Sequence, residues 1–179
     1  MTFTHLHTHS HYSLLDGMSK VKDMVKLAKE HGMTAIALTD HGVMYGAIDF
    51  YTTCVKNGIK PIIGVEAYVA NRTRFQKEPG IDNKRYHLTL LAKDNTGYQN
   101  LIKLTTAAHL EGYYYKPRVD KDILRTHAEG LLCLSGCPGS ELGRAIQSGN
   151  KEKAEAVILE YQAIFGPENY YLEIMHHPD

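Results

Sequence analysis

The chain has 179 residues, of which 43% are hydrophobic and 22% charged, and its formal net charge is zero. This length predicts one domain with a sizeable core, and the charge balance excludes a global basic field, so any phosphate contact must be local. The apolar residues form no run near the about 18 positions of a membrane span and no signal-peptide core, so we expect a cytoplasmic protein without a membrane partner.

The chain begins with a run of alternating histidines between Thr2 and His11, which Asp16-Gly17 closes. Alternate side chains of an extended strand point the same way, so these imidazoles would share one face. Such a face suits a divalent metal better than a core or a solvated surface. A histidine-rich tail or tag is the alternative, but the helical pattern that follows continues into a folded chain.

The elements after this first strand follow from hydrophobic periodicity and from the positions of glycine and proline. In chain order we expect a helix over 18–31, a strand over 34–39, a helix over 47–57, a strand over 61–65, a polar excursion over 71–85, a strand over 87–92, helices over 95–109 and 120–127, a strand over 131–134, helices over 141–147 and 151–165, and a strand over 170–175. Ser19 is the expected N-cap of the first helix, which Gly32 ends.

Strand and helix alternate with short connections, which predicts an α/β fold of parallel strands joined by right-handed crossovers. The strands are continuously apolar, as expected where both faces of a sheet are covered. A doubly wound open sheet and a barrel both fit this alternation. No glycine-rich phosphate fingerprint follows the first strand, which argues against dinucleotide binding.

Side chains that can bind metal recur where the expected strands end. They are His7 and His9 after the first strand, Asp40-His41 after the second, Glu66 after the third and Cys137 after the fifth. In parallel α/β folds the functional edge carries these C-terminal strand ends. His87 is the exception because it precedes its strand, so that strand must be entered differently or the loop before it must fold back.

Each candidate taken alone also has a structural interpretation. His41 could cap the next turn, Asp40 could form an Asx-turn, and Glu66 could be a surface carboxylate. His87 could be a core histidine bonded to a backbone carbonyl. Cys137 could be a buried thiol, as Cys54 and Cys133 are expected to be; the odd number of cysteines without a CxxC pair favours a reducing compartment.

Taken together, the candidates combine imidazole, carboxylate and thiolate, which suits Zn, Mn or Fe better than Mg or Ca. The set is His7, His9, Asp16, His41, Glu66, His87 and Cys137. One tetrahedral zinc uses about four ligands, so this set implies at least two ions, bridged by Glu66 or Asp16. Clustered divalent ions beside an open position are suited to phosphate-ester hydrolysis.

These motifs resemble the PHP (polymerase and histidinol phosphatase) domain. The resemblance rests on His7-x-His9 with Asp16-Gly17, Thr39-Asp-His-Gly42, Gly64-Val-Glu-Ala-Tyr68, His87-Leu-Thr-Leu-Leu91 and Ser135-Gly-Cys137. Residues 13–17, 58–68, 95–101 and 128–132 are similar, more narrowly, to the N-terminus of bacterial replicative DNA polymerases. The resemblance covers the whole chain.

The resemblance implies a distorted TIM-like (β/α)7 barrel with two to three divalent ions at the C-terminal ends of its strands. His7 and His9 match the first metal-binding pair and Asp16 the carboxylate after it. Further ligand positions are matched by His41, Glu66, His87 and Cys137. The resemblance therefore implies that His87 is a ligand although it precedes its strand. Asp40 matches a position that orients His41, while His5 and His11 fall outside the ligand positions.

The resemblance also implies function and partners. In some relatives the centre is a 3′–5′ exonuclease that serves proofreading; in others the ligands have decayed and the domain docks a separate exonuclease. Every ligand position that the chain covers holds a competent residue, so we expect the active type. The implied partners are a DNA primer-template, the remainder of the polymerase chain, a proofreading exonuclease subunit and other replisome subunits.

Two family features are missing from the sequence. No Asp-x-His pair follows Tyr170, where the unassigned pair His176-His177 stands instead, and no polymerase palm is present. We therefore expect residues 1–179 to be the N-terminal part of a PHP domain, truncated at its C-terminal end, in a longer polymerase chain.

Two other functions remain open at this point: a stand-alone phosphatase of the histidinol-phosphate type, and a non-catalytic scaffold whose metals only stabilise the fold. The basic residues Arg72, Arg74, Lys77, Lys84 and Arg85 could contact phosphates or form a solvated loop.

Overall fold

Helices and strands alternate along the chain in nearly the expected order. The computed structural model describes residues 3–175, so the His176-His177 pair lies outside the described residues. The elements are α1 (Val21–Glu30), β1 (Ala35–Leu38), α2 (Ala47–Lys56), β2 (Lys60–Ala70), β3 (Arg85–Ala92), α3 (Asn95–Leu110), β4 (Arg118–Val119), α4 (Lys121–Thr126), β5 (Leu131–Leu134), α5 (Glu141–Gln147), α6 (Lys151–Phe165), the 3-10 turn η1 (Pro167–Asn169) and β6 (Tyr170–Tyr171). The short strand β4 and the turn η1 were not predicted, and β6 is much shorter than expected.

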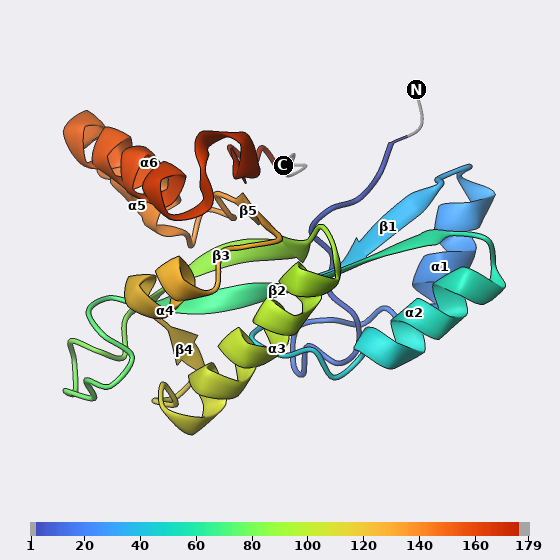
Figure 1. Ribbon diagram of the computed structural model, residues 1–179, viewed down its shortest axis with the longest axis horizontal. Helices are drawn as coiled ribbons and strands as arrows, with labels where there is room; N and C mark the ends of the chain where they lie inside the picture. Colours follow the sequence, from blue (N-terminus) through green and yellow to red (C-terminus); the bar gives the residue numbers. More distant parts are fainter. Residues whose placement is uncertain (1–2, 176–179) are drawn as a thin grey trace.

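Within residues 3–175 the strands form one open, mixed sheet in the order β1-β2-β3-β5-β6, with β4 paired to β2 (Figure 1). The expected α/β class is confirmed, but the expectation of an all-parallel arrangement is wrong and the sheet is not closed into a barrel. β1 and β2 are parallel, whereas β3 runs antiparallel to both β2 and β5. Residues 71–84 join β2 to β3 without a crossover helix, and such a connection permits an antiparallel pair.

The strand expected over the histidine run is not formed. Backbone bonds from Ala37 to His5 and from Thr39 to Thr8 place the run beside β1. At Thr8, however, side-chain hydroxyls bond to the backbone of the neighbouring segment. The Thr8 hydroxyl donates to the carbonyl of Ala37, and the Thr39 hydroxyl bonds to both the N–H and the carbonyl of Thr8. Side-chain hydroxyls of this kind compete with a regular ladder. The run is therefore an extended segment that still carries its imidazoles to the edge of the sheet.

The N-cap expected for the first helix is also wrong. Lys20, not Ser19, precedes the first helical residue of α1, and no side chain caps that end. The carbonyl of Ser19 instead accepts a hydrogen bond from the backbone of His11 at 2.9 Å. Residue 19 thus belongs to the loop that follows the histidine run.

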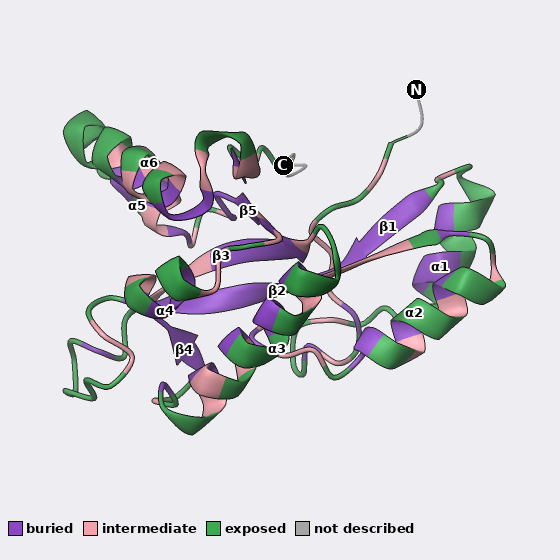
Figure 2. Ribbon diagram, viewed as in Figure 1, coloured by how far each residue is buried: buried purple, intermediate pink, exposed green. Residues whose placement is uncertain are grey.

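Two cores lie on the helix-covered side of the sheet. Val65, Ala67 and Leu90 pack with side chains of α3, α4 and α6 in the larger core, and α1 and α2 pack against β1 in the smaller one. Figure 2 shows the central strands mostly buried and the outer helix faces exposed. Alternation along β2 and β3 turns the residues between these core positions, Glu66 and Thr89 among them, to the other face. This second face also carries a small apolar cluster of Ala37, Leu91 and Leu134. The expectation of continuously apolar strands therefore holds for β1 and β5 and fails only where Glu66, His87 and Thr89 interrupt β2 and β3.

The polar excursion between β2 and β3 is anchored by a buried arginine on β4. Arg118 is fully buried and donates hydrogen bonds of 2.7–3.1 Å to the carbonyl oxygens of Arg74, Gln76, Asp82 and Gly112. The excursion is mostly exposed as expected, but it is held in place. Among the described residues no helix is both long and apolar enough to cross a membrane.

Candidate metal centre

One buried carboxylate, Glu66, lies at the centre of the site. It was expected to end a strand, but β2 continues past it to Ala70, and its side chain is 1% exposed. Its Oε1 lies 3.3 Å from His7 Nε2 and 3.1 Å from His87 Nδ1. Its Oε2 lies 3.6 Å from His9 Nε2 and contacts His41 Nδ1. Four imidazoles from three chain segments thus surround one carboxylate.

The mixed sheet explains how these segments meet. His41 follows β1 and forms a parallel bridge with Glu66. Because β3 is antiparallel to β2, the beginning of β3 lies at the edge where β2 ends, and His87 pairs with Tyr68. This strand direction accounts for the position of His87 before its predicted strand. Cys137 follows β5, and its Sγ lies 3.4 Å from His87 Nδ1 and 3.7 Å from Glu66 Oε1.

Asp16 completes the set from the loop after the histidine run. Its Oδ2 lies 2.9 Å from His41 Nε2, and its side chain is 57% exposed. Asp40 is buried and accepts hydrogen bonds from the backbone of Ser10 and from the hydroxyls of Ser10 and Ser13. The Ser13 hydroxyl in turn accepts a bond from the backbone N–H of His41. Asp40 therefore fixes the loop and the backbone of His41, while Asp16 and Glu66 contact the imidazole.

The donor atoms of this cluster suit divalent cations. His7 Nε2, His41 Nδ1 and Glu66 Oε2 are buried and, among the described residues, have no hydrogen-bond partner outside the cluster itself. Three overlapping groups each bring ligand atoms within 4.8 Å of one another: His7, His9 and Glu66; His9, Asp16 and His41; and His41, Glu66 and His87. Buried polar atoms rarely stay unpaired, and imidazole with carboxylate is a donor set of zinc and related metals.

In His7 and in His9, one ring nitrogen is held by another protein group and the other points at Glu66. His9 Nδ1 lies 2.9 Å from the carbonyl oxygen of Thr39, to which it can donate, and this leaves Nε2 directed at Glu66. His7 Nδ1 lies 2.6 Å from Glu173 Oε1, which leaves Nε2 directed at Glu66. A carboxylate or carbonyl behind an imidazole is the usual support of a metal-binding histidine.

Without metal, protons provide the positive charge of the cluster. Burial alone would raise the pKa of Glu66, but contacts with His41, His7 and His87 hold that pKa well below its usual range. Burial alone would lower the pKa of His7, but Glu173 and Glu66 raise it to about 10. Contacts with Cys137 and Glu66 raise the pKa of His87 to about 9 despite burial. Burial and the neighbouring His41 instead lower the pKa of His9, which favours its neutral form.

Sequence reasoning missed Glu173 and Thr89. Besides its contact with Glu173, His7 Nδ1 lies 3.2 Å from the Thr89 hydroxyl on β3. Glu173 was included in the interior of an expected strand over 170–175, but β6 ends at Tyr171. The rule that places acids after strand ends would have selected Glu173 had the shorter strand been recognised.

The remaining histidines of the first run lie outside the cluster. His5 packs edge-on against Phe3 and His11 packs on Tyr12. A cleft of about 1210 Å³ reaches the cluster only through His7 and Glu173 and is otherwise lined mainly by apolar residues such as Ile63, Leu91 and Leu134. The ligand atoms, and not this cleft, therefore define the chemical site.

The sequence matches the PHP domain family over residues 5–177, so the chain belongs to the PHP domain family. It is 50% identical over 99% of its length to DNA polymerase III subunit alpha of Treponema pallidum and 49% identical over 99% of its length to that of Thermus aquaticus. It spans 15% of the length of each of these relatives.

Comparison of structures supports the fold. A crystal structure from Bifidobacterium adolescentis, provisionally named a metal-dependent phosphoesterase, superposes with a TM-score of 0.60 over 96% of this chain and 77% of that one, at 12% identity. At this identity the likeness shows the fold alone. It supports the mixed α/β architecture, and the expected (β/α)7 barrel is not confirmed because the sheet formed by residues 3–175 is open.

Proposed function

We propose that this chain is the N-terminal PHP domain segment of a bacterial replicative DNA polymerase and that its metal cluster hydrolyses phosphodiesters at a DNA 3′ end. One observation carries the catalytic part: four imidazoles and a thiol converge on the buried Glu66, and three of the buried ligand atoms have no hydrogen-bond partner outside the cluster among the described residues. The relatives support the polymerase part, since they are DNA polymerase III alpha subunits of which the chain spans 15%.

The proposed ligands are His7, His9, Asp16, His41, Glu66, His87 and Cys137, which would hold two to three ions of Zn, Mn or Fe. Such ions lower the pKa of water and stabilise negative charge on phosphate oxygens. One oxygen of Glu66 lies near His7 and His87 and the other near His9 and His41, so Glu66 would hold metal together with either pair of histidines. Glu173 holds His7, and Asp40 holds the loop that ends at Asp16.

Asp16 is the most exposed member of the cluster, and its carboxylate contacts His41 Nε2. This pair therefore forms the side of the site that is open to solvent. We place the domain in the cytoplasm, in contact with a primer-template, the rest of the polymerase chain, a proofreading exonuclease subunit and other replisome subunits.

A 3′-labelled single-stranded oligonucleotide tests the proposal. With Mn²⁺ or Zn²⁺ the wild-type protein should release terminal nucleotides, and Glu66→Gln should slow release by about 100-fold or more because it removes the bridging charge. His127→Gln, at the C-terminal end of α4 outside the cluster, is the matched control and should leave the rate unchanged.

The other two functions give different results in this assay. If metals raise the melting temperature but the labelled terminus stays intact, the domain is a scaffold. If small phosphomonoesters are hydrolysed and DNA is not, the domain is a phosphatase of the histidinol-phosphate type.

A further inference from the structure

The basic residues around the excursion divide into two classes. Arg72 is bound by Glu78 and Asp82, and Arg74 by Glu111 and Asp120. Their charges are neutralised locally, so they are poor candidates for an external anion. By contrast, no ion pair among residues 3–175 includes Arg85 or Lys116.

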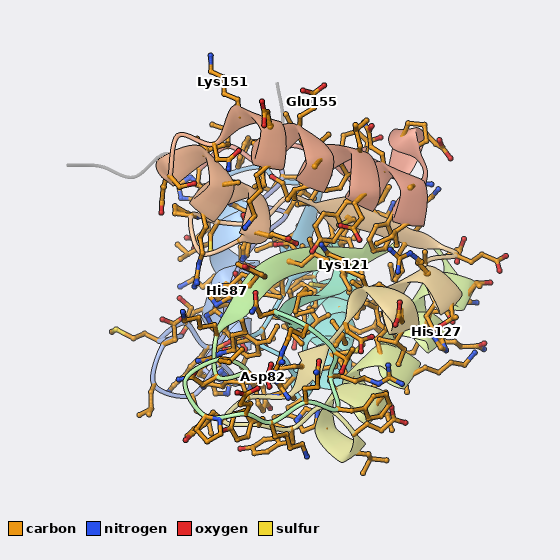
Figure 3. All side chains as sticks on the ribbon, turned by 90° about the vertical axis from the view of Figure 1, so that its left-hand side faces the viewer. Asp82, His87, Lys121, His127, Lys151 and Glu155 are labelled. Carbon is orange, nitrogen blue, oxygen red and sulfur yellow. The ribbon has the colours of Figure 1, made fainter. Side chains whose placement is uncertain are left out.

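Arg85 lies on the same face of the sheet as the metal cluster. It is the first residue of β3 and pairs with Ala70, while His87, two residues on, pairs with Tyr68. Alternation therefore turns Arg85 and His87 to the same side, at a separation of about 7 Å along the strand. Figure 3 shows His87 near the loop that carries Asp82, which leads into β3. Within the described residues the buried Nε of Arg85 has no hydrogen-bond partner, and Nη1 bonds only to the carbonyl of Asn83.

Tyr68 holds two cations beside the histidines. The Arg85 guanidinium lies 5.4 Å and the Lys116 ammonium 5.8 Å from the centroid of the Tyr68 ring, both within the range of a cation–π contact. The same ring centroid is 5.3 Å from that of His87 and 6.0 Å from that of His41. Tyr68 is only 6% exposed, so it cannot stack on a nucleobase. Its role is to set the positions of the cations relative to the cluster.

We propose that Arg85 and Lys116 bind the phosphate adjacent to the one hydrolysed at the metal cluster, so that the site takes a single strand of nucleic acid rather than an isolated phosphate ester. This assignment rests on the proposed function. A guanidinium with unpaired donors is suited to bidentate contact with phosphate, and Lys116 adds a second charge. The offset of Arg85 from His87 leaves the metal ligands to the reacting phosphate and places Arg85 at its neighbour.

Kinetics on a single-stranded deoxythymidylate 12-mer with Mn²⁺ test the assignment. Arg85→Gln should raise KM by about tenfold, the effect of losing a charge-assisted hydrogen bond, with kcat nearly unchanged. Lys116→Gln should act in the same direction more weakly, and Arg85→Lys should recover part of the loss. Lys84→Gln removes an exposed charge of the same sign next to Arg85 and is the matched control, expected to match wild type.

A second substrate locates the contact. A methylphosphonate that replaces the phosphate next to the terminal one removes a single charge from the strand. For the wild-type protein it should cost at least as much in KM as Arg85→Gln, and for Arg85→Gln it should cost only the smaller contribution of Lys116. The phosphate assignment of Arg85 would be overturned if the increases in KM caused by the methylphosphonate and by Arg85→Gln were fully additive. It would also be overturned if Arg85→Gln and Lys84→Gln had equal effects.

Equilibrium binding separates this assignment from the proposed function. With fluorescein-labelled 12-mer and no divalent metal, Arg85→Gln should reduce the slope of log affinity against log salt by about 0.7, one phosphate contact on a single strand. If the wild-type protein hydrolyses the strand but Arg85→Gln leaves both KM and this slope at wild-type values, only the phosphate assignment fails. If no metal supports hydrolysis, the proposed function fails, and the salt slope then decides whether Arg85 binds the strand.

Discussion

Metal binding should expel protons from the cluster, and the number follows from the structure. His7 and His87, with pKa values of about 10 and about 9, are both protonated at pH 7.5 in the metal-free protein. A ligating imidazole must be neutral at the coordinating nitrogen. His7 can keep its Nδ1 proton on Glu173 and lose the one on Nε2. Binding of metal at this pH should therefore release at least two protons, one from each of these imidazoles, and any proton on the Cys137 thiol in addition. The apparent affinity should rise by about 100-fold or more per pH unit.

Calorimetric titration with Mn²⁺ in two buffers of different ionisation enthalpy measures this number. His7→Gln should lower it by about one. His9→Gln, a variant of the same motif, should weaken binding without changing the number, because burial lowers the pKa of His9 and leaves it neutral. A binding enthalpy that is the same in both buffers would refute the view that protons occupy the metal positions.

Three further predictions concern stability. In the metal-free protein, the stability contributed by His7 is fully present below the unfolded pKa of about 6.5 and is lost as pH rises through about 10. The melting temperature should fall over that range. A melting temperature that does not change with pH would contradict the raised pKa of His7. Arg118→Met should lower the free energy of unfolding in urea by about 3 kcal/mol or more, because it leaves four carbonyl oxygens without their hydrogen bonds. Arg125→Met on the exposed side of α4 should lower it by less than about 1 kcal/mol. Equal losses would show that the buried contacts of Arg118 are not needed. Gly97→Ala should destabilise the fold despite the gain of about 1 kcal/mol in helix propensity, because the new Cβ would lie 1.9 Å from the carbonyl oxygen of Gly130; a higher melting temperature would show that α3 can shift.

Helix positions could be predicted closely, because α5 and α6 follow from local periodicity alone. The direction of β3 could not, since nothing in an apolar run from His87 to Ala92 specifies a parallel or an antiparallel partner. For the histidine run, the predicted strand was wrong but the predicted location of the imidazoles was right, because side chains alternate in direction along any extended segment. Threonine hydroxyls at Thr8 and Thr39 decided against a regular strand there, and their competition with the backbone becomes visible only when both segments are side by side.

The predicted ligand set is brought together by the structure, although its metal-binding role remains a prediction. His41, Glu66 and Cys137 were selected by their position near strand ends, which the topology places at one edge. Glu173 was missed because its contact with His7 depends on where β6 stops. Arg85 could not be separated from Arg72 and Arg74 in the sequence, since only the ion pairs in the fold distinguish neutralised from unpaired cations.

The metal centre itself can be tested by anomalous diffraction from crystals of the protein grown with Mn²⁺ or Zn²⁺. If the cluster binds metal, peaks should lie at coordination distance, about 2.0–2.3 Å, from Glu66 and from His7 or His41, and they should be lost in crystals of Glu66→Gln. Full occupancy of metal elsewhere, with no peak within reach of Glu66, would contradict metal binding by the cluster.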